Sequence, residues 1–113
     1  MDIHFNYVHV SASDSLEELA REKLNKLKSY YDFIVSADVY FKKEKSTNPD
    51  ELETTANPRK DKACEIQLNL PGPEIFISSI EESFSKALYN NINDLKRQLR
   101  KRKERMNTHR PRA

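Results

Sequence analysis

The chain has 113 residues, which suits one small domain. Leu, Ile, Val and Phe make up about 23% of it, just above the roughly 20% below which disorder is expected. The sequence contains no run of 18 apolar residues, so no transmembrane helix is expected. The formal net charge of +2 conceals an asymmetry, because residues 96–112 hold nine basic residues and one acid, so that this segment carries +8 and the rest of the chain −6. Such a segment favours a polyanionic partner, either nucleic acid or a membrane surface.

The first part of the chain predicts a strand, a helix and a second strand. In residues 3–8 apolar and polar side chains alternate, as in a half-buried strand. Ser13 is a good N-cap for a helix of about four turns, whose apolar residues recur every three or four positions: Leu16, Leu19, Ala20, Leu24, Leu27 and Tyr31. Residues 33–42 alternate again and predict a strand whose inward face carries Val35, Ala37, Val39 and Phe41.

The second part predicts two more strands and a closing helix. Residues 44–62 contain two Asn-Pro pairs and no periodicity, and we interpret them as a mobile connecting loop. Residues 63–70 predict a strand with Cys64, Ile66, Leu68 and Leu70 facing inward. Pro71-Gly72-Pro73 supplies a turn into a hairpinned strand at 74–80. The closing helix begins near Ser83 and presents five apolar residues to the core: Phe84, Leu88, Ile92, Leu95 and Leu99.

The order βαβββα predicts an α+β fold. We expect one mainly antiparallel four-stranded sheet with both helices packed on one face, an order similar to that of double-stranded-RNA-binding domains. The other face is wet and mixed in charge, and carries His4, Asn6, Asp38, Tyr40, Lys42, Glu65, Gln67 and Asn69. We assign residues 1–106 to a single domain and residues 107–113 to a basic C-terminal tail.

Catalysis receives little support from the sequence. The histidines at positions 4, 9 and 109 have no ligand-like spacing among themselves or to Cys64, which is more often a small core residue than a nucleophile. Gly72 is the only glycine, so no glycine-rich phosphate loop is possible. We therefore expect a binding module rather than an enzyme, with no cofactor, no metal and no small-molecule substrate. A single cysteine also suits a reducing cytosol.

Basic residues on the two helices are the candidate binding surface. Lys23 falls near the middle of the apolar stripe of the first helix. Its stem either packs at the edge of the core with the ammonium in water, or the ammonium is held at a functional surface beside Lys26. The closing helix opposes its core stripe with a face of Asn and basic residues, which suits contacts to phosphate and sugar: Lys86, Asn90, Asn93, Arg97, Arg100 and Lys101.

Beyond Leu99 the closing helix has no apolar residue until Met106, so we expect it to project past the sheet or to fray. A solubilising tail is the simplest alternative, but the density of Arg favours phosphate contacts. A leucine zipper needs a longer heptad pattern than this helix has. A membrane-surface helix needs apolar residues opposite the charge, so we expect no membrane partner here. Nucleic acid is the favoured partner, although the residues do not distinguish DNA from RNA.

The chain resembles the ribosome hibernation-promoting factors, also called ribosome-associated inhibitors or sigma 54 modulation proteins. The resemblance covers nearly the whole chain and rests on four segments in order: residues 10–16 at the turn into the first helix, residues 22–27 with Tyr30, residues 84–88, and residues 95–103. It implies a βαβββα domain that binds the small ribosomal subunit in the channel used by mRNA and the tRNA anticodon ends. It also implies silencing of translation under stress or in stationary phase, without chemistry or a cofactor.

The resemblance further implies that basic side chains contact ribosomal RNA phosphates, and we predict nine such residues: Lys23, Lys26, Lys28, Lys86, Arg97, Arg100, Lys101, Arg102 and Lys103. It implies a bacterial, cytoplasmic protein that is monomeric when free. Without the second domain of long forms, we expect a short form that silences single ribosomes or helps another factor to pair them. The alternative is a regulatory protein-interaction module, in which the acidic loop binds a partner and the basic tail only maintains solubility.

Overall fold

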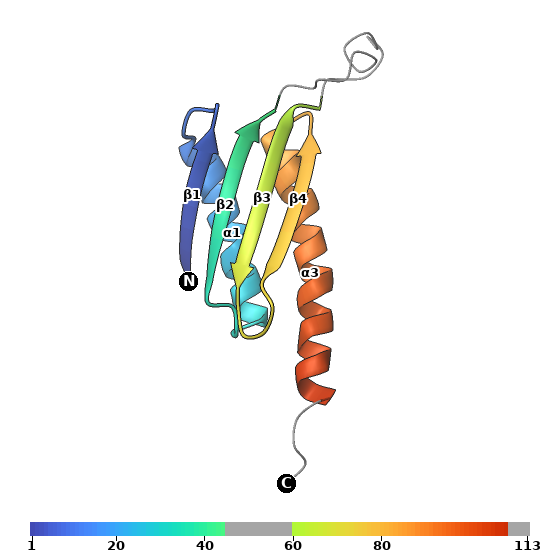
Figure 1. Cartoon of the computed structure of the whole chain (residues 1–113). Helices are drawn as coiled ribbons and strands as arrows, with labels where there is room; N and C mark the ends of the chain where they lie inside the picture. Colours follow the sequence, from blue (N-terminus) through green and yellow to red (C-terminus); the bar gives the residue numbers. More distant parts are fainter. Residues whose placement is uncertain (45–59, 109–113) are drawn as a thin grey trace.

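The structure, a computed structural model, describes residues 1–44 and 60–108 (Figure 1). Its elements are β1 (Asp2–Val8), α1 (Asp14–Tyr30), β2 (Ser36–Lys43), β3 (Lys62–Asn69), β4 (Ile75–Glu81) and α3 (Phe84–Thr108). The predicted order βαβββα is confirmed. Most of the loop predicted at residues 44–62 and most of the tail predicted at residues 107–113 lie outside the described residues, so both interpretations stay predictions.

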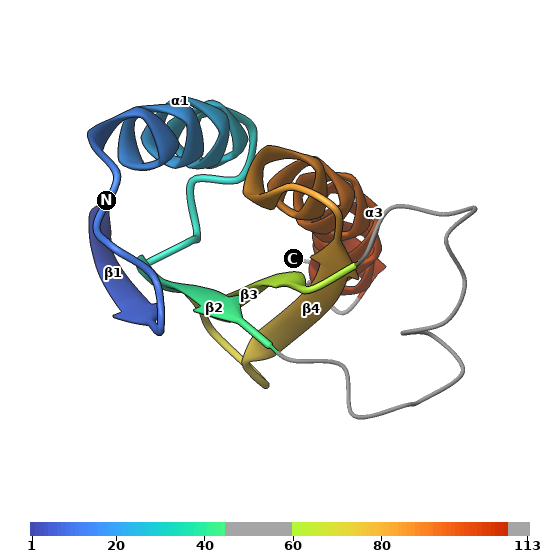
Figure 2. The ribbon, with the colours of Figure 1, turned by 90° about the horizontal axis from the view of Figure 1, so that it is seen from above.

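The four strands form one sheet in the order β1-β2-β3-β4. β2 pairs antiparallel with β3, and β3 with β4, whereas β1 runs parallel to β2. Parallel neighbours require a crossover, which α1 provides. Figure 2 shows both helices on the same face of the sheet, with α1 over β1 and β2 and α3 over β3 and β4. The predicted fold class is therefore confirmed, while the likeness to double-stranded-RNA-binding domains stays a prediction.

The core lies between the sheet and the two helices, and Phe41 of β2 is its largest fully buried side chain. The ring of Phe41 stacks on Tyr7 of β1, with centroids 5.7 Å apart, and meets the edge of Phe84 of α3, also at 5.7 Å. Leu24 of α1 and Leu95 of α3 are fully buried on either side. Burial of a side chain of this size contributes roughly 1.5–3 kcal/mol, so the predicted apolar stripes hold both helices on the sheet.

One predicted core position is wrong. Val35 was expected on the inward face of the second strand, but it is 62% exposed, and the preceding Ile34 is buried instead. β2 begins only at Ser36, so the alternation of the strand does not extend back to these residues. The chain leaves α1 through a tight bend, in which the Ile34 amide donates to the Tyr31 carbonyl at 3.2 Å, and this bend turns Ile34 rather than Val35 toward the core.

Helix α3 is longer than the sheet on which it packs. Its 25 residues span about 37 Å at 1.5 Å per residue, whereas the seven residues of β4 span only about 23 Å. The helix begins after Ser83, whose hydroxyl accepts the Lys86 amide at 3.2 Å as an N-cap. Figure 1 shows its C-terminal part continuing past the end of the sheet, as predicted, and it stays helical to Thr108.

Candidate nucleic-acid interface

A groove of about 840 Å³ lies between α1 and α3. Its floor is apolar and includes Leu27 and Ile92, and the tyrosines at the end of α1, Tyr30 and Tyr31, also line it. The other lining side chains are mostly cationic or amide: Lys23, Lys26, Asn93, Lys96, Arg97, Arg100, Lys103 and Asn107, with one acid, Glu104. Six cations from two helices therefore surround one hollow.

Helical spacing explains this gathering. On α3 the lining positions recur at alternating intervals of three and four, which places them on one stripe: Asn93, Lys96, Arg100, Lys103 and Asn107. On α1 the same rule aligns Lys23, Lys26 and Tyr30. Because the two helices lie side by side on one face of the sheet (Figure 2), the two stripes form the opposite walls of the groove.

The charge of the groove is largely uncompensated within the described part of the chain. Arg97 pairs with Asp94 on its own helix, but the other five cations form no ion pair with a described carboxylate: Lys23, Lys26, Lys96, Arg100 and Lys103. Like charges gathered beside an apolar floor raise a positive potential that attracts anions. The groove is therefore suited to a ligand that carries several phosphates.

Two of these cations are held by aromatic rings. The Lys23 ammonium lies 5.3 Å from the ring centroid of Tyr89, and the Lys103 ammonium lies 5.6 Å from that of Tyr31. Such cation–π contacts orient a flexible side chain without neutralising its charge. For Lys23, the sequence left open an ammonium in water or one at a functional surface, and the structure places it on the groove wall together with Lys26.

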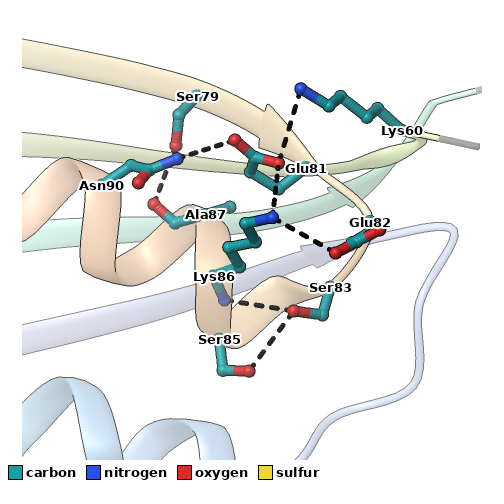
Figure 3. Close-up of polar contacts among 9 residues, drawn as sticks. All are labelled: Lys60, Ser79, Glu81, Glu82, Ser83, Ser85, Lys86, Ala87 and Asn90. Atoms are coloured by element: carbon teal, nitrogen blue, oxygen red, sulfur yellow. Dashed lines mark hydrogen bonds and ion pairs between the residues drawn. The ribbon is translucent and has the colours of Figure 1, made fainter. Parts of the chain in front are cut away.

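Four of the nine predicted RNA-binding residues lie outside the groove, and two of these, Lys28 and Lys86, have partners of their own. The Lys28 ammonium donates to the carbonyls of Asp32 and Ile34, beyond the last turn of α1. The negative end of the helix dipole also stabilises a cation at this position. Lys86 lies at the first turn of α3 (Figure 3), with Glu82 at 3.2 Å and Glu81 at 3.9 Å. The structure does not bring Lys28 or Lys86 to the groove.

The surroundings of Lys86 form a tight polar junction between β4 and α3 (Figure 3). The Ser79 hydroxyl donates to the Ala87 carbonyl at 2.7 Å, and the Asn90 amide donates to Glu81 at 2.8 Å. The second oxygen of Glu81 accepts no hydrogen bond from the described residues, and its ion pairs with Lys60 and Lys86 are longer, at 3.7 and 3.9 Å. The hydrogen bond to Glu82, followed by the charges of Glu82 and Glu81, raises the pKa of Lys86.

Arg102 lies on the other flank of α3 and contacts the β3–β4 turn. Its guanidinium donates to the Pro71 carbonyl at 2.8 Å and to the Pro73 carbonyl at 2.7 Å. Gly72, between them, has φ +88°, and a Cβ there would lie only 3.2 Å from the guanidinium. Arg102 also lines a second, smaller hollow of about 340 Å³ with Arg97, Lys101 and Arg105. The predicted residues Lys101 and Arg102 thus face away from the groove.

Sequence reasoning did not include Lys96, Tyr30, Tyr31 or Asn107 among the site residues. A signal for Lys96 and Asn107 was present, because they share the three-and-four spacing of Asn93, Arg100 and Lys103. Tyr31 had been assigned to the apolar stripe of the first helix, and it is half-buried. No pattern within α1 alone indicates that Tyr30 faces a groove, since the other wall comes from α3.

Among the described residues, the remaining groups that could carry chemistry form no second site. Cys64 is fully buried, and burial raises the pKa of its thiol to about 12. Within residues 1–44 and 60–108, no cluster of His, Cys, Asp and Glu is placed to hold a metal ion. Within the same ranges no helix combines the length and apolar character needed to cross a membrane.

Comparison with known proteins identifies the family. The family model described as "Sigma 54 modulation protein / S30EA ribosomal protein" matches residues 3–107. The chain belongs to this family. The resemblance stated from the sequence is thereby confirmed, and the family description itself links its members to the ribosome. A search of curated proteins found no match.

Solved structures agree with the family in fold. A ribosomal subunit interface protein from Coxiella burnetii is 24% identical, with a TM-score of 0.72, over 92% of this chain and 99% of that one. The N-terminal domain of Protein Y from Thermus thermophilus is 20% identical, with a TM-score of 0.68, over 89% of this chain and 98% of that one. At these identities the likeness establishes the fold alone, which this chain shares with both structures.

Proposed function

We propose that this chain binds the small ribosomal subunit through ribosomal RNA phosphates and silences translation by occupying the channel of mRNA and the tRNA anticodon ends. The observation that carries the proposal is the groove between α1 and α3, where six cations from two helices gather in a member of a ribosome-associated family. The solved relative from Coxiella burnetii is itself called a ribosomal subunit interface protein. The proposal needs no catalytic step and no cofactor.

The shape of the molecule supports this mode of binding. Because α3 exceeds the length of β4 by about 14 Å, its C-terminal part reaches into a space that the broad sheet does not enter (Figure 1). A single helix is about 10–12 Å across with its side chains, narrow enough to enter a channel lined with RNA. Phosphates on both sides of that channel would meet the groove cations and the second basic flank at Lys101 and Arg105.

The proposal extends to the setting in which the chain acts. We expect a bacterial, cytoplasmic protein, monomeric when free, that acts under stress or in stationary phase. The nine residues predicted from the sequence divide accordingly. Five of them line the groove and are the proposed RNA contacts there: Lys23, Lys26, Arg97, Arg100 and Lys103, to which we add Lys96 because it lines the same groove.

Co-sedimentation with isolated small ribosomal subunits across a salt series tests the proposal. The test variant carries Lys26→Gln, Arg100→Gln and Lys103→Gln, all exposed groove residues on two helices. The matched control carries Arg21→Gln, Lys43→Gln and Lys60→Gln, which are exposed, lie outside the groove and change the net charge equally. The control separates a local contact from general electrostatic attraction.

We expect saturable one-to-one binding by the wild type and by the control. Six phosphate contacts at a slope of about 0.7 to 0.9 each predict that affinity falls on the order of 10³-fold between 50 and 200 mM salt. Removal of three contacts lowers the slope of log K against log salt by about two to three. Equal weakening of test and control variants would contradict the groove as the site. Absence of wild-type binding at low salt would favour the protein-interaction alternative.

A further inference from the structure

The tyrosines around the groove differ in what covers their rings. Tyr31 is half-buried, packs against Phe33 with centroids 6.0 Å apart, and carries the Lys103 ammonium over its ring. Tyr89 carries the Lys23 ammonium. Tyr30 is 63% exposed and, among the described residues, has no ring contact and no cation over its ring. The groove therefore contains one aromatic face that the fold does not use.

The position of Tyr30 matters because phosphate-binding cations flank it. Tyr30 is the last residue of α1, four positions after Lys26, and it lines the same hollow as Arg100 and Lys103. Proteins that bind single-stranded nucleic acid combine a positively charged groove with aromatic side chains on which bases stack. In a duplex the faces of the bases are covered by their neighbours, whereas an unpaired base offers a free face to a ring such as Tyr30.

The size of the groove also favours a single strand. About 840 Å³ lies within the range of pockets that enclose a drug-sized ligand, so the groove admits a few nucleotides of one strand and does not enclose a duplex. Its apolar floor at Leu27 and Ile92 suits the face or edge of a base more than a phosphate. Cations at the rim and apolar groups at the floor match a strand whose phosphates point outward and whose base points inward.

We propose that the groove takes an unpaired RNA segment and that Tyr30 stacks on one of its bases, so that the protein selects single-stranded over double-stranded RNA. This inference rests on the proposed function and deepens it, because it names the form of RNA that the groove recognises. The cations supply affinity for any RNA backbone. Tyr30 adds a stacking contact to the face of a base, which is covered in a base-paired duplex.

Four chains test the inference in the subunit-binding assay: the wild type, Tyr30→Phe, Tyr30→Ala, and Tyr40→Ala as a control. Tyr40 lies on the outer face of the sheet, away from the groove, with the Lys42 ammonium over its ring. Stacking is worth about 1–3 kcal/mol per base by alanine substitution, so Tyr30→Ala should bind about 5- to 150-fold more weakly. Tyr30→Phe keeps the ring and should bind like the wild type, as should Tyr40→Ala.

The salt series gives a readout that loss of structure or charge would not mimic. Tyr30→Ala removes no cation, so its slope of log K against log salt should equal that of the wild type, in contrast to the groove variant above. In the same assay, a short single-stranded RNA should displace the wild-type protein from subunits at lower concentration than an RNA duplex of equal length. Circular dichroism should show that the Tyr30 variants keep the fold, since the side chain is exposed.

The outcomes separate the inference from the function on which it rests. If the wild type binds subunits and Tyr30→Ala binds equally well, or if the duplex competes as effectively as the single strand, the stacking inference is wrong and the proposed function stands. If Tyr30→Phe is as weak as Tyr30→Ala, the hydroxyl rather than the ring is recognised, and stacking is again wrong. If the wild type does not bind subunits at all, the proposed function fails first.

Discussion

The two halves of helix α3 have opposite surroundings. In residues 84–99 every third or fourth side chain is buried against the sheet, including Leu88, Leu95 and Leu99. In the same half, Lys86 is paired with two carboxylates. In residues 100–107 every side chain except Arg102 is exposed, and Arg100 and Lys103 form no ion pair with a described carboxylate.

This difference shows that the number of positive charges alone does not identify a binding surface, because some of the charges are balanced within the chain. Lys86 and Lys103 are both lysines on the same helix, yet the charge of Lys86 is balanced by Glu81 and Glu82 of its own chain (Figure 3). Lys103 is held over an aromatic ring and keeps its charge for a partner. We therefore expect substitutions of buried or paired residues in the first half to change stability, and substitutions of the cations that line the groove to change binding.

The largest expected effect concerns stability. Leu95 is fully buried between α3 and the sheet, and Leu95→Ala should lower the free energy of unfolding by about 2–5 kcal/mol through lost burial and a residual cavity. Met106, in the projecting half, is 42% exposed, and Met106→Ala should change it by no more than about 0.5 kcal/mol. Urea unfolding followed by circular dichroism measures both. Comparable losses in the two variants would contradict the division of the helix.

A pH effect should follow from the burial of Cys64 beneath the first half of α3, where the Asn91 amide donates to the Cys64 carbonyl at 2.8 Å. Burial raises the pKa of the thiol from 9.0 to about 12. Between these values the unfolded thiol has lost its proton and the folded one has kept it. Stability is therefore fully present below pH 9 and falls as pH rises, by up to about 1.4 kcal/mol per pH unit.

Urea unfolding between pH 8 and pH 10.5 measures this slope, with Cys64→Ala as the control that has no thiol to titrate. Other groups also titrate in this range, so the difference between the two slopes is the relevant quantity. We expect the wild type to lose stability more steeply than Cys64→Ala above pH 9. Parallel curves would show that the thiol ionises equally in both states and that the first half of α3 does not seal it from water.

A smaller effect is expected at Arg102, which the sequence predicted to be an RNA contact. In the structure its guanidinium donates hydrogen bonds to the carbonyls of Pro71 and Pro73. If it positions the projecting half of α3, Arg102→Ala should weaken subunit binding by about fivefold, since such bonds contribute about 1 kcal/mol. The salt slope should not change, and amides of residues 100–107 should exchange faster with solvent. A slope reduced by about 0.7 to 0.9 would instead indicate a lost phosphate contact.

Arg105→Ala is the matched control for Arg102, because Arg105 lies one turn further on the same flank and lines the same small hollow. Arg105 is exposed, and no described carbonyl accepts a hydrogen bond from it. Its substitution should leave amide exchange in residues 100–107 unchanged. Equal acceleration of exchange in both variants would remove the argument for a positioning role at Arg102.

The smallest effect is expected at Lys86. Lys86→Gln removes an exposed cation that is already paired, and the subunit affinity should stay within about twofold of the wild type because paired surface charges contribute little. The hydrogen bond to Glu82 raises the pKa of Lys86, so the residue stays charged at neutral pH and the comparison is not affected by its titration. A loss of affinity as large as that of an Arg100→Gln variant measured beside it would contradict the difference between the two ends of the helix.

The sequence by itself determined the order of the elements, the inward faces of both helices, the cap at Ser13 and the start of the closing helix near Ser83. These features follow from local rules, because periodicity and capping depend on residues within a few positions of one another. The Ser13 cap was confirmed at 3.3 Å to the Leu16 amide, and the helix start predicted near Ser83 was confirmed, where the Ser83 hydroxyl accepts the Lys86 amide at 3.2 Å. The family was likewise accessible from segments in order along the chain.

Only the tertiary structure decided which basic residues share a site. Lys26 and Arg100 lie on different helices and meet across one groove, whereas Arg102 finds its acceptors 31 and 29 residues away in the β3–β4 turn. Lys and Arg side chains are long and flexible, so their partners are set by whichever element packs beside them rather than by their sequence neighbours. The exposure of Val35 has the same origin, since it depends on where the sheet ladder begins.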